Sequence, residues 1–86
     1  MASMGEALFK ACFNDQAREV RRLLSGGADF NYVDELGRTP LMAASQNGHV
    51  EVVGMLLAAE ANANTADDTG STALHWASFN GHIVIL

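Results

Sequence analysis

Three histidines are the first side chains in this sequence to consider for catalysis or metal binding. His49, His75 and His82 could transfer protons or bind a metal ion. Either task needs several ligands that converge on one point, and no Cys, His or carboxylate group lies at metal-ligand spacing from them. We therefore expect the three imidazoles to serve as hydrogen-bonding groups within the fold, and we predict no metal site.

A single cysteine, Cys12, is the only thiol that could act as a nucleophile. A reactive cysteine needs a neighbouring base and an electropositive setting, whereas free cysteines are among the residues most often buried. We expect a small, buried and unreactive side chain. One cysteine also excludes an internal disulfide framework, which favours a reducing, intracellular compartment, either cytoplasmic or nuclear.

Two pairs of adjacent carboxylates could carry out acid–base chemistry. Asp34-Glu35 and Asp67-Asp68 are separated by 33 residues, and no obvious catalytic partner stands beside either pair. We expect them to be solvent-exposed charges at the edges of loops. Because the chain offers no catalytic constellation, we predict that it is not an enzyme and that it holds no cofactor.

Composition excludes further classes of protein. The 86 residues suffice for one domain, and a content of 49% hydrophobic and 17% charged residues is too apolar for intrinsic disorder. A net charge of −5 argues against general binding to nucleic acid or to an anionic membrane surface. No apolar run is long enough for a membrane span or follows a basic start as a secretory signal would.

An internal repeat of 33 residues dominates the chain. Nine of the twenty pairs from Asp34/Asp67 to Val53/Leu86 are identical, whereas chance gives about one. The same offset extends backward to Leu8, which aligns with Leu41. We predict a single domain over 1–86, made of a first unit at 1–33, a full unit at 34–66 and an incomplete unit at 67–86.

Each unit has the pattern of two short helices and a turn. Thr39-Pro40 provides a capping hydroxyl and a proline at the first helical position. Small residues then allow close helix approach, and Asn47-Gly48 ends the helix. A second apolar stripe follows over 52–57, and then a polar loop that ends at Gly70. Helices this short need neighbours to be stable.

Residues 37–44 (Gly-Arg-Thr-Pro-Leu-Met-Ala-Ala), with Gly48-His49 after them, resemble the ankyrin repeat, and so do residues 70–77 with Gly81-His82. The resemblance implies an all-α solenoid of stacked helix-turn-helix units, joined by β-hairpin-like loops, in which the first helices line a concave face. It implies a protein-interaction module whose partner is another protein. The alternative is an N-terminal regulatory or targeting segment of a larger enzyme or channel.

The resemblance also indicates which residues contact a partner. Phe13 and Phe79 share one repeat position with Gln46, near the concave face, and Trp76 is a further aromatic anchor there. Packing between repeats is the alternative role for Phe79 and Trp76. The other predicted contacts are one concave-face residue, Met42, and six loop-edge residues, namely Glu35, Leu36, Arg38, Asp68, Thr69 and Ser71.

Departures from the repeat pattern yield further expectations. Polar Glu19 and Arg22 replace apolar residues of the next unit, which is typical of an N-terminal capping repeat. With Arg18 and Arg21, Arg22 forms a solvated face or, alternatively, a docking patch for an acidic partner. Glu60 aligns with Gly27, so we predict a left-handed backbone at Glu60.

Two expectations concern the end of the chain and its loops. The sequence stops at residues 83–86 (Ile-Val-Ile-Leu), so we expect a fragment, a truncated product or a chain whose end a partner covers. Without such a cover, the chain is expected to be marginally stable or to self-associate through this apolar end. Asn31 and Asn64 occupy matching loop positions, where turn chemistry explains asparagine. The resemblance makes Asn31, with Leu23 and Asp29 upstream of it, a loose match to substrates of an asparaginyl hydroxylase.

Overall fold

A computed structural model of the chain describes residues 3–79, with Phe79 described by its backbone alone. This range folds into five helices, and no strand occurs within it: α1 (Met4–Phe13), α2 (Ala17–Ser25), α3 (Pro40–Gln46), α4 (Val50–Ala58) and α5 (Ala73–Phe79). The all-helical prediction is therefore confirmed. The predictions for His82, and for self-association through Ile83, Ile85 and Leu86, concern residues outside the described range.

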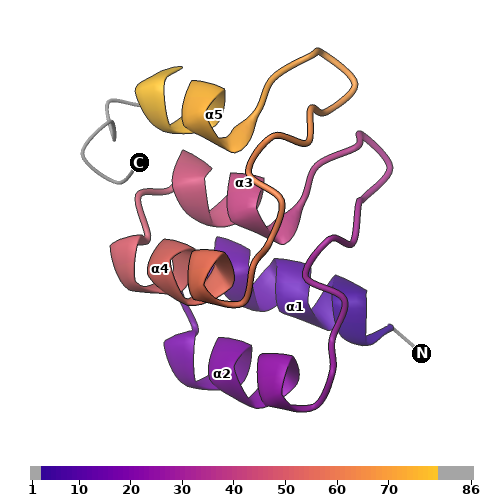
Figure 1. Cartoon of the computed structure of the whole chain (residues 1–86), viewed down its shortest axis with the longest axis vertical. Coiled ribbons are helices and arrows are strands. Elements are labelled where there is room, and N and C mark those ends of the chain that lie inside the picture. The colour runs from indigo at the N-terminus through magenta and orange to yellow at the C-terminus, as the bar shows by residue number, and fades with distance from the viewer. Residues whose placement is uncertain (1–2, 80–86) are drawn as a thin grey trace.

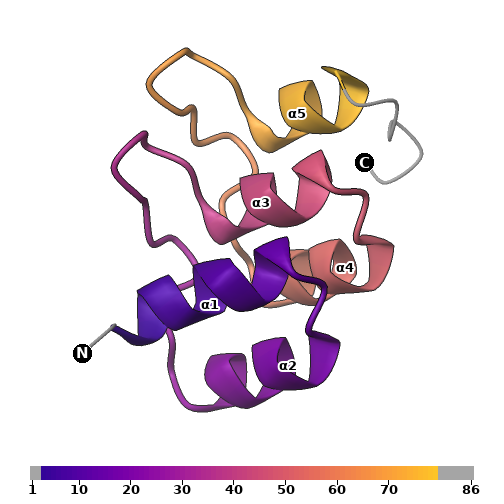
Figure 2. The ribbon, with the colours of Figure 1, turned by 180° about the vertical axis from the view of Figure 1, so that it is seen from behind.

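The helices form two layers that are repeated along the molecule. Helices α1, α3 and α5 stack on one another as one layer, while α2 and α4 form a second layer that packs against α1 and α3 (Figure 1). The turns between paired helices lie at one edge, and the two long loops project from the opposite edge, as the reverse view also shows (Figure 2). The first helix of each unit therefore lies between the loops and the helix turns.

The helix starts follow from their capping residues. The Thr39 hydroxyl accepts a hydrogen bond from the Met42 amide at 3.2 Å, and Pro40 occupies the first turn, where its missing N–H has no consequence. At α1 the Ser3 hydroxyl accepts the Glu6 amide at 3.1 Å. Completely buried alanines such as Ala44 and Ala77 let α3 and α5 approach closely.

Left-handed residues form the turns of each unit. Asp15 and Gly48 stand at φ 57° and 72° between the paired helices. Gly27 and Glu60 stand at φ 88° and 71° after the second helices. After each of them, the next amide donates a hydrogen bond back to a carbonyl in the last part of the helix. Ala28 N donates to Leu23 O at 2.9 Å, and Ala61 N donates to Leu56 O at 3.0 Å. The left-handed backbone predicted at Glu60 is confirmed.

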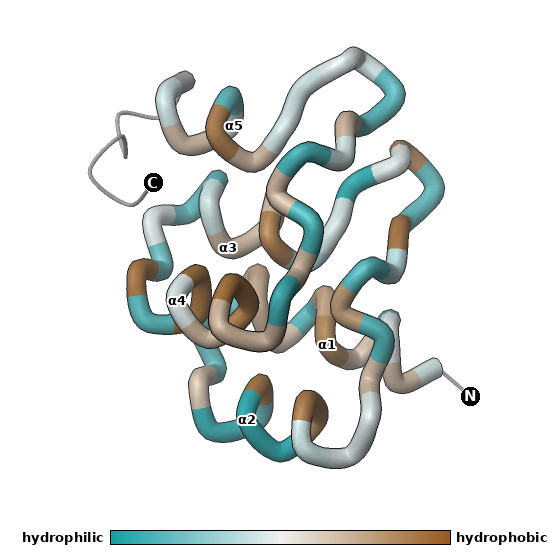
Figure 3. The backbone as a smooth tube through the Cα atoms, in the orientation of Figure 1, coloured by the Kyte–Doolittle hydropathy of each residue, from teal (hydrophilic) through white to brown (hydrophobic). Residues whose placement is uncertain are grey.

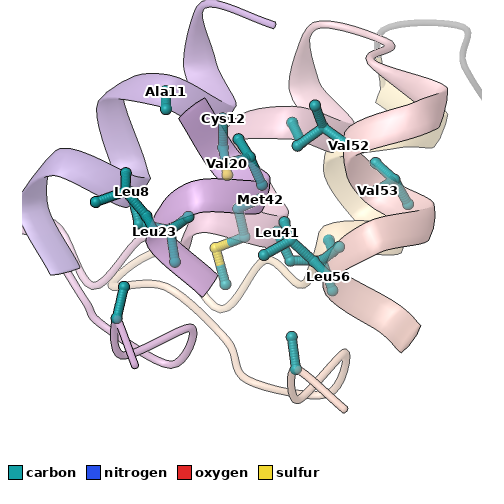
Figure 4. Packing of buried hydrophobic residues seen from close by; sticks show 14 residues of the cluster. Leu8, Ala11, Cys12, Val20, Leu23, Leu41, Met42, Val52, Val53 and Leu56 are labelled. Atoms are coloured by element: carbon teal, nitrogen blue, oxygen red, sulfur yellow. The ribbon is translucent and has the colours of Figure 1, made fainter. Parts of the chain in front are cut away.

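The core lies between the two layers, where leucines and valines from α1 to α4 meet (Figure 4). Met42 belongs to this core and is 1% exposed, so its predicted role as a partner contact is corrected. Its burial follows from its position, because α3 lies between α1 and α5 and is backed by α4. Cys12 is also fully buried, which confirms the predicted burial, and this burial raises the pKa of its thiol to about 12, which disfavours the reactive thiolate.

The outer side of α2 is polar, in contrast with the more hydrophobic α4 (Figure 3). Arg18, Arg21 and Arg22 are exposed there. Arg22 forms an ion pair with Glu19, and the Arg21 guanidinium lies 3.9 Å from the Glu51 carboxylate of α4. These contacts are exposed and contribute little to stability. The capping role of the first unit stays a prediction.

Candidate functional site

Two loops with the same hairpin geometry form the projecting edge. In the first, the Asp34 amide donates to Arg38 O at 2.9 Å and the Gly37 amide donates to Asp34 O at 3.0 Å. Gly37 has φ 76°, which completes a three-residue hairpin turn with a left-handed last position. Asp67, Gly70 and Ser71 repeat the arrangement in the second loop. The predicted hairpin-like loops are confirmed.

A carboxylate fastens the first hairpin from within. Asp34 Oδ1 accepts the amides of Leu36 and Arg38 at 2.9 and 2.8 Å, and Oδ2 accepts Arg38 Nε at 2.8 Å. Burial alone would raise the pKa of Asp34, but the hydrogen bonds from Arg38 and Leu36 outweigh it and lower the pKa. Asp34 is therefore an ionised turn anchor rather than a free loop charge.

Asp67 has the same function in the second hairpin, with different partners. Its Oδ1 accepts the Thr69 amide at 2.9 Å, the Thr69 hydroxyl at 2.6 Å and the Ser71 amide at 3.0 Å. Its Oδ2 accepts the indole Nε1–H of Trp76 at 2.9 Å. Burial would raise the pKa of Asp67, but these hydrogen bonds together lower it to about 2.

The prediction that Asp34 and Asp67 are solvent-exposed charges is wrong. Asp67 is only 8% exposed and Asp34 is half-buried, because each carboxylate turns inward to satisfy amides of its own loop. The second members of the pairs, Glu35 and Asp68, are exposed as expected.

The two hairpins are joined to each other at their tips. The Asp68 amide donates to Leu36 O at 2.9 Å. A Cβ built on Gly37 would lie 2.7 Å from Asp68 Oδ1, so the second loop packs directly against the glycine of the first. Leu36 nevertheless keeps 55% of its surface exposed, and Val33 keeps 50%. The joined tips therefore present apolar side chains from a fixed backbone.

An aromatic cluster extends this edge onto α1. The rings of Phe9 and Tyr32 meet edge to face with centroids 6.2 Å apart, and the Arg38 guanidinium lies over Phe9, 5.6 Å from its centroid. Gly5 lets Tyr32 pack against α1, since a Cβ there would stand 2.8 Å from the ring. We did not predict this cluster, although Phe9 shares the repeat position of Met42.

A pocket of about 220 Å³ opens beside the second hairpin, lined by Thr69, Ser71, His75 and Trp76. Trp76 is half-buried and also packs against the core, so both roles considered for it, packing and surface contact, are compatible with its position. A larger and shallower hollow of about 630 Å³ lies between α1 and α2, where Ala7, Lys10 and Arg18 are among its lining residues.

The predicted contact residues fall into two groups at opposite ends of the inner helices. Seven of them meet at the hairpins: Glu35, Leu36, Arg38, Asp68, Thr69, Ser71 and Trp76. Phe13, which is 42% exposed, and Gln46 end α1 and α3 at the far edge. The Phe79 side chain is outside the described part of the structure. A single compact partner site therefore cannot be centred on both groups.

Two of the remaining candidates, His49 and Asn31, have structural roles, whereas His75 is exposed and lines the pocket beside the second hairpin. His49 Nε2 lies 3.0 Å from Phe13 O, and Asn47 Nδ2 donates to the same carbonyl at 3.1 Å, which confirms hydrogen bonding between repeats for His49. Asn31 Oδ1 accepts the Asn62 amide at 3.1 Å and so links successive loops. Its hydroxylation stays a prediction.

The described residues contain neither a metal-binding cluster nor a helix that could span a membrane. Across residues 3–79, no three His, Cys, Asp or Glu side chains gather as a metal site would need. In the same range, no helix has the length and apolar character to cross a membrane.

A comparison with protein families agrees with the helical pairs and hairpins described above. The family model for ankyrin repeats, which contains three copies of the repeat, matches residues 7–86.

Proposed function

Because the chain belongs to the ankyrin-repeat family, whose members are generally protein–protein interaction modules, we propose that it binds a protein partner through its joined hairpins. We call this surface the hairpin face and define it by Glu35, Leu36, Arg38, Asp68, Thr69, Ser71 and Trp76. The observation that carries the proposal is the hydrogen bond from Asp68 N to Leu36 O, which joins two anchored loops into one edge.

Rigidity makes this edge suitable for binding. A mobile loop loses conformational entropy when a partner orders it, and this loss weakens the complex. Asp34 and Asp67 remove most of that freedom in advance, because each accepts hydrogen bonds from amides across its own turn. The exposed Leu36 is then an apolar anchor that a partner can cover without reordering the backbone.

The test compares two exposed leucines of the same chain. Leu36 on the hairpin face and Leu57 on α4 are 55% and 39% exposed. A partner is first selected from a display library of cellular protein fragments, and its affinity is then measured by calorimetry. Leu36→Ala is expected to weaken binding by about 2 kcal/mol if Leu36 is an anchor, whereas Leu57→Ala leaves the affinity unchanged.

Both variants remove the same number of carbon atoms from exposed positions, so neither is expected to unfold the chain. Circular dichroism of each variant checks this. A partner whose affinity falls with Leu57→Ala and not with Leu36→Ala would place the binding surface on the second-helix layer and refute the proposal.

A further inference from the structure

Charge is distributed unevenly along this solenoid. After Arg22, Arg38 is the only Lys or Arg in the sequence, against seven acidic residues: Asp29, Asp34, Glu35, Glu51, Glu60, Asp67 and Asp68. Burial, and then the carboxylates of Glu6, Asp34 and Glu35, raise the pKa of the Tyr32 phenol. The hairpins themselves carry four of these acidic residues, Asp34, Glu35, Asp67 and Asp68, against the single cation Arg38. The hairpin side of the molecule is therefore electronegative, which favours a basic partner.

The first hairpin shows how this fold holds a guanidinium group. Arg38 Nε donates to Asp34 Oδ2 at 2.8 Å, and its Cζ lies 5.6 Å from the centroid of the Phe9 ring. A turn carboxylate and an aromatic ring thus hold the cation between them. Arginine suits this arrangement because its planar group stacks on a ring while its N–H groups point to acceptors.

The second hairpin has the carboxylate and an aromatic side chain, but it lacks the arginine. Ser71 stands where Arg38 stands in the first unit, and Trp76 Nε1 donates to Asp67 Oδ2 in place of an arginine. The pocket of about 220 Å³ lies at this point, between Ser71, Thr69, His75 and Trp76. Its walls combine an indole with two hydroxyl-bearing residues, next to an ionised carboxylate.

We propose that this pocket accepts an arginine side chain of the protein partner, so that the partner supplies to the second hairpin the guanidinium that Arg38 supplies to the first. The inference rests on the proposed function, because it names the chemistry of the partner at the hairpin face. The guanidinium stacks on the Trp76 indole and donates to the hydroxyls of Ser71 and Thr69. The Asp67 carboxylate, which contacts Thr69, Ser71 and Trp76 of the pocket, favours a cation over a neutral or acidic group.

The probe for this inference is N-acetyl-arginine amide, with N-acetyl-citrulline amide as its neutral isostere. Trp76 is the only tryptophan, so its indole N–H gives a single, unambiguous signal in a ¹⁵N–¹H spectrum. The arginine amide is expected to shift this signal to saturation, while citrulline leaves it in place. The lysine analogue is expected to bind more weakly, because an ammonium group does not stack on the indole as a planar guanidinium does.

A matched pair of variants adds one arginine inside the pocket or far from it. Ser71→Arg places an arginine at the position that Arg38 has in the first hairpin and fills the pocket, so we expect it to weaken binding of the arginine amide about ten-fold or more, which corresponds to about 1.4 kcal/mol. Ser25→Arg adds the same charge on α2, where Ser25 is exposed, and is expected to leave binding nearly unchanged.

Three results would overturn the inference: an unmoved indole signal, an equal response to citrulline, or equal binding by Ser71→Arg. Its failure is distinguishable from failure of the proposed function. A partner that depends on Leu36 but binds Ser71→Arg normally, and that tolerates loss of its own arginines, would leave the hairpin face in place and remove only the arginine pocket.

Discussion

The turn after α4 contains a residue that is poorly suited to its backbone conformation. Glu60 is exposed and has φ 71°, while Gly27 occupies the same position one repeat earlier with φ 88°. A Cβ on Gly27 would have no neighbour within 4 Å, so the cost of a side chain in this turn is conformational and not steric crowding. A residue with a Cβ in the left-handed conformation costs about 1–2 kcal/mol. Replacing it with glycine removes this cost, but glycine also adds entropy to the unfolded chain, which offsets part of the gain. Glu60→Gly is therefore expected to raise the free energy of unfolding by about 0.5–1 kcal/mol.

Urea denaturation measures this gain. With a slope of about 1 kcal/mol per molar urea for a small domain, the midpoint rises by about 0.5–1 M at an unchanged slope. Glu60→Gln is the control, because it removes the charge and keeps the Cβ, and it is expected to leave the midpoint close to that of the parent chain. If Glu60→Gly lowers the midpoint, leaves it in place, or does no better than Glu60→Gln, the reasoning about backbone strain is refuted.

Three further predictions concern the core and the hairpins. Ser45→Ala removes a fully buried hydroxyl for which the described residues offer no hydrogen-bond partner, so we expect the free energy of unfolding, measured by thermal denaturation, to rise by about 1 kcal/mol. Ser78 is exposed, so Ser78→Ala is the control and should leave this free energy unchanged. Because the folded pKa of Asp67 is lowered from 3.8 to about 2, its contribution to stability is complete above pH about 4 and is lost as pH falls toward 2. Asp67→Asn should therefore flatten this part of a pH–stability curve, and an unchanged curve would contradict the hydrogen-bonded carboxylate. Gly37→Ala and Gly70→Ala both place a Cβ at positive φ, but only the first meets the neighbouring hairpin, so Gly37→Ala should lower the urea midpoint more; equal losses would mean that the hairpins do not pack together.

Much of the fold could be predicted because the repeat transfers backbone geometry from one unit to the next. Gly27 identified the left-handed turn at Glu60, and the Thr39-Pro40 pair located the start of α3. Burial of Cys12 followed in the same way from its alignment with the inner stripe. In each case the local sequence pattern and the position in the repeat led to the same conclusion.

The candidate site was less predictable, because it depends on which side chains meet in space. The spacing of Asp34 from Gly37, repeated by Asp67 and Gly70, is a hairpin-turn signal that would have placed both carboxylates inward. Met42 shares a repeat position with Phe9, yet Met42 is buried and Phe9 is only partly so, since α3 has a helix on each side. Alignment gives the position of a residue, and its neighbours decide its burial.

Mapping of a bound partner on the ¹⁵N-labelled chain tests the central claim most directly. The claim is that the partner contacts the hairpin face. The largest shifts are then expected at the amides of residues 35–38 and 68–71 and at the Trp76 indole N–H, which Asp67 holds at 2.9 Å. Shifts confined to the outer residues of α2 and α4, with the hairpin amides and the indole signal unmoved, would contradict it.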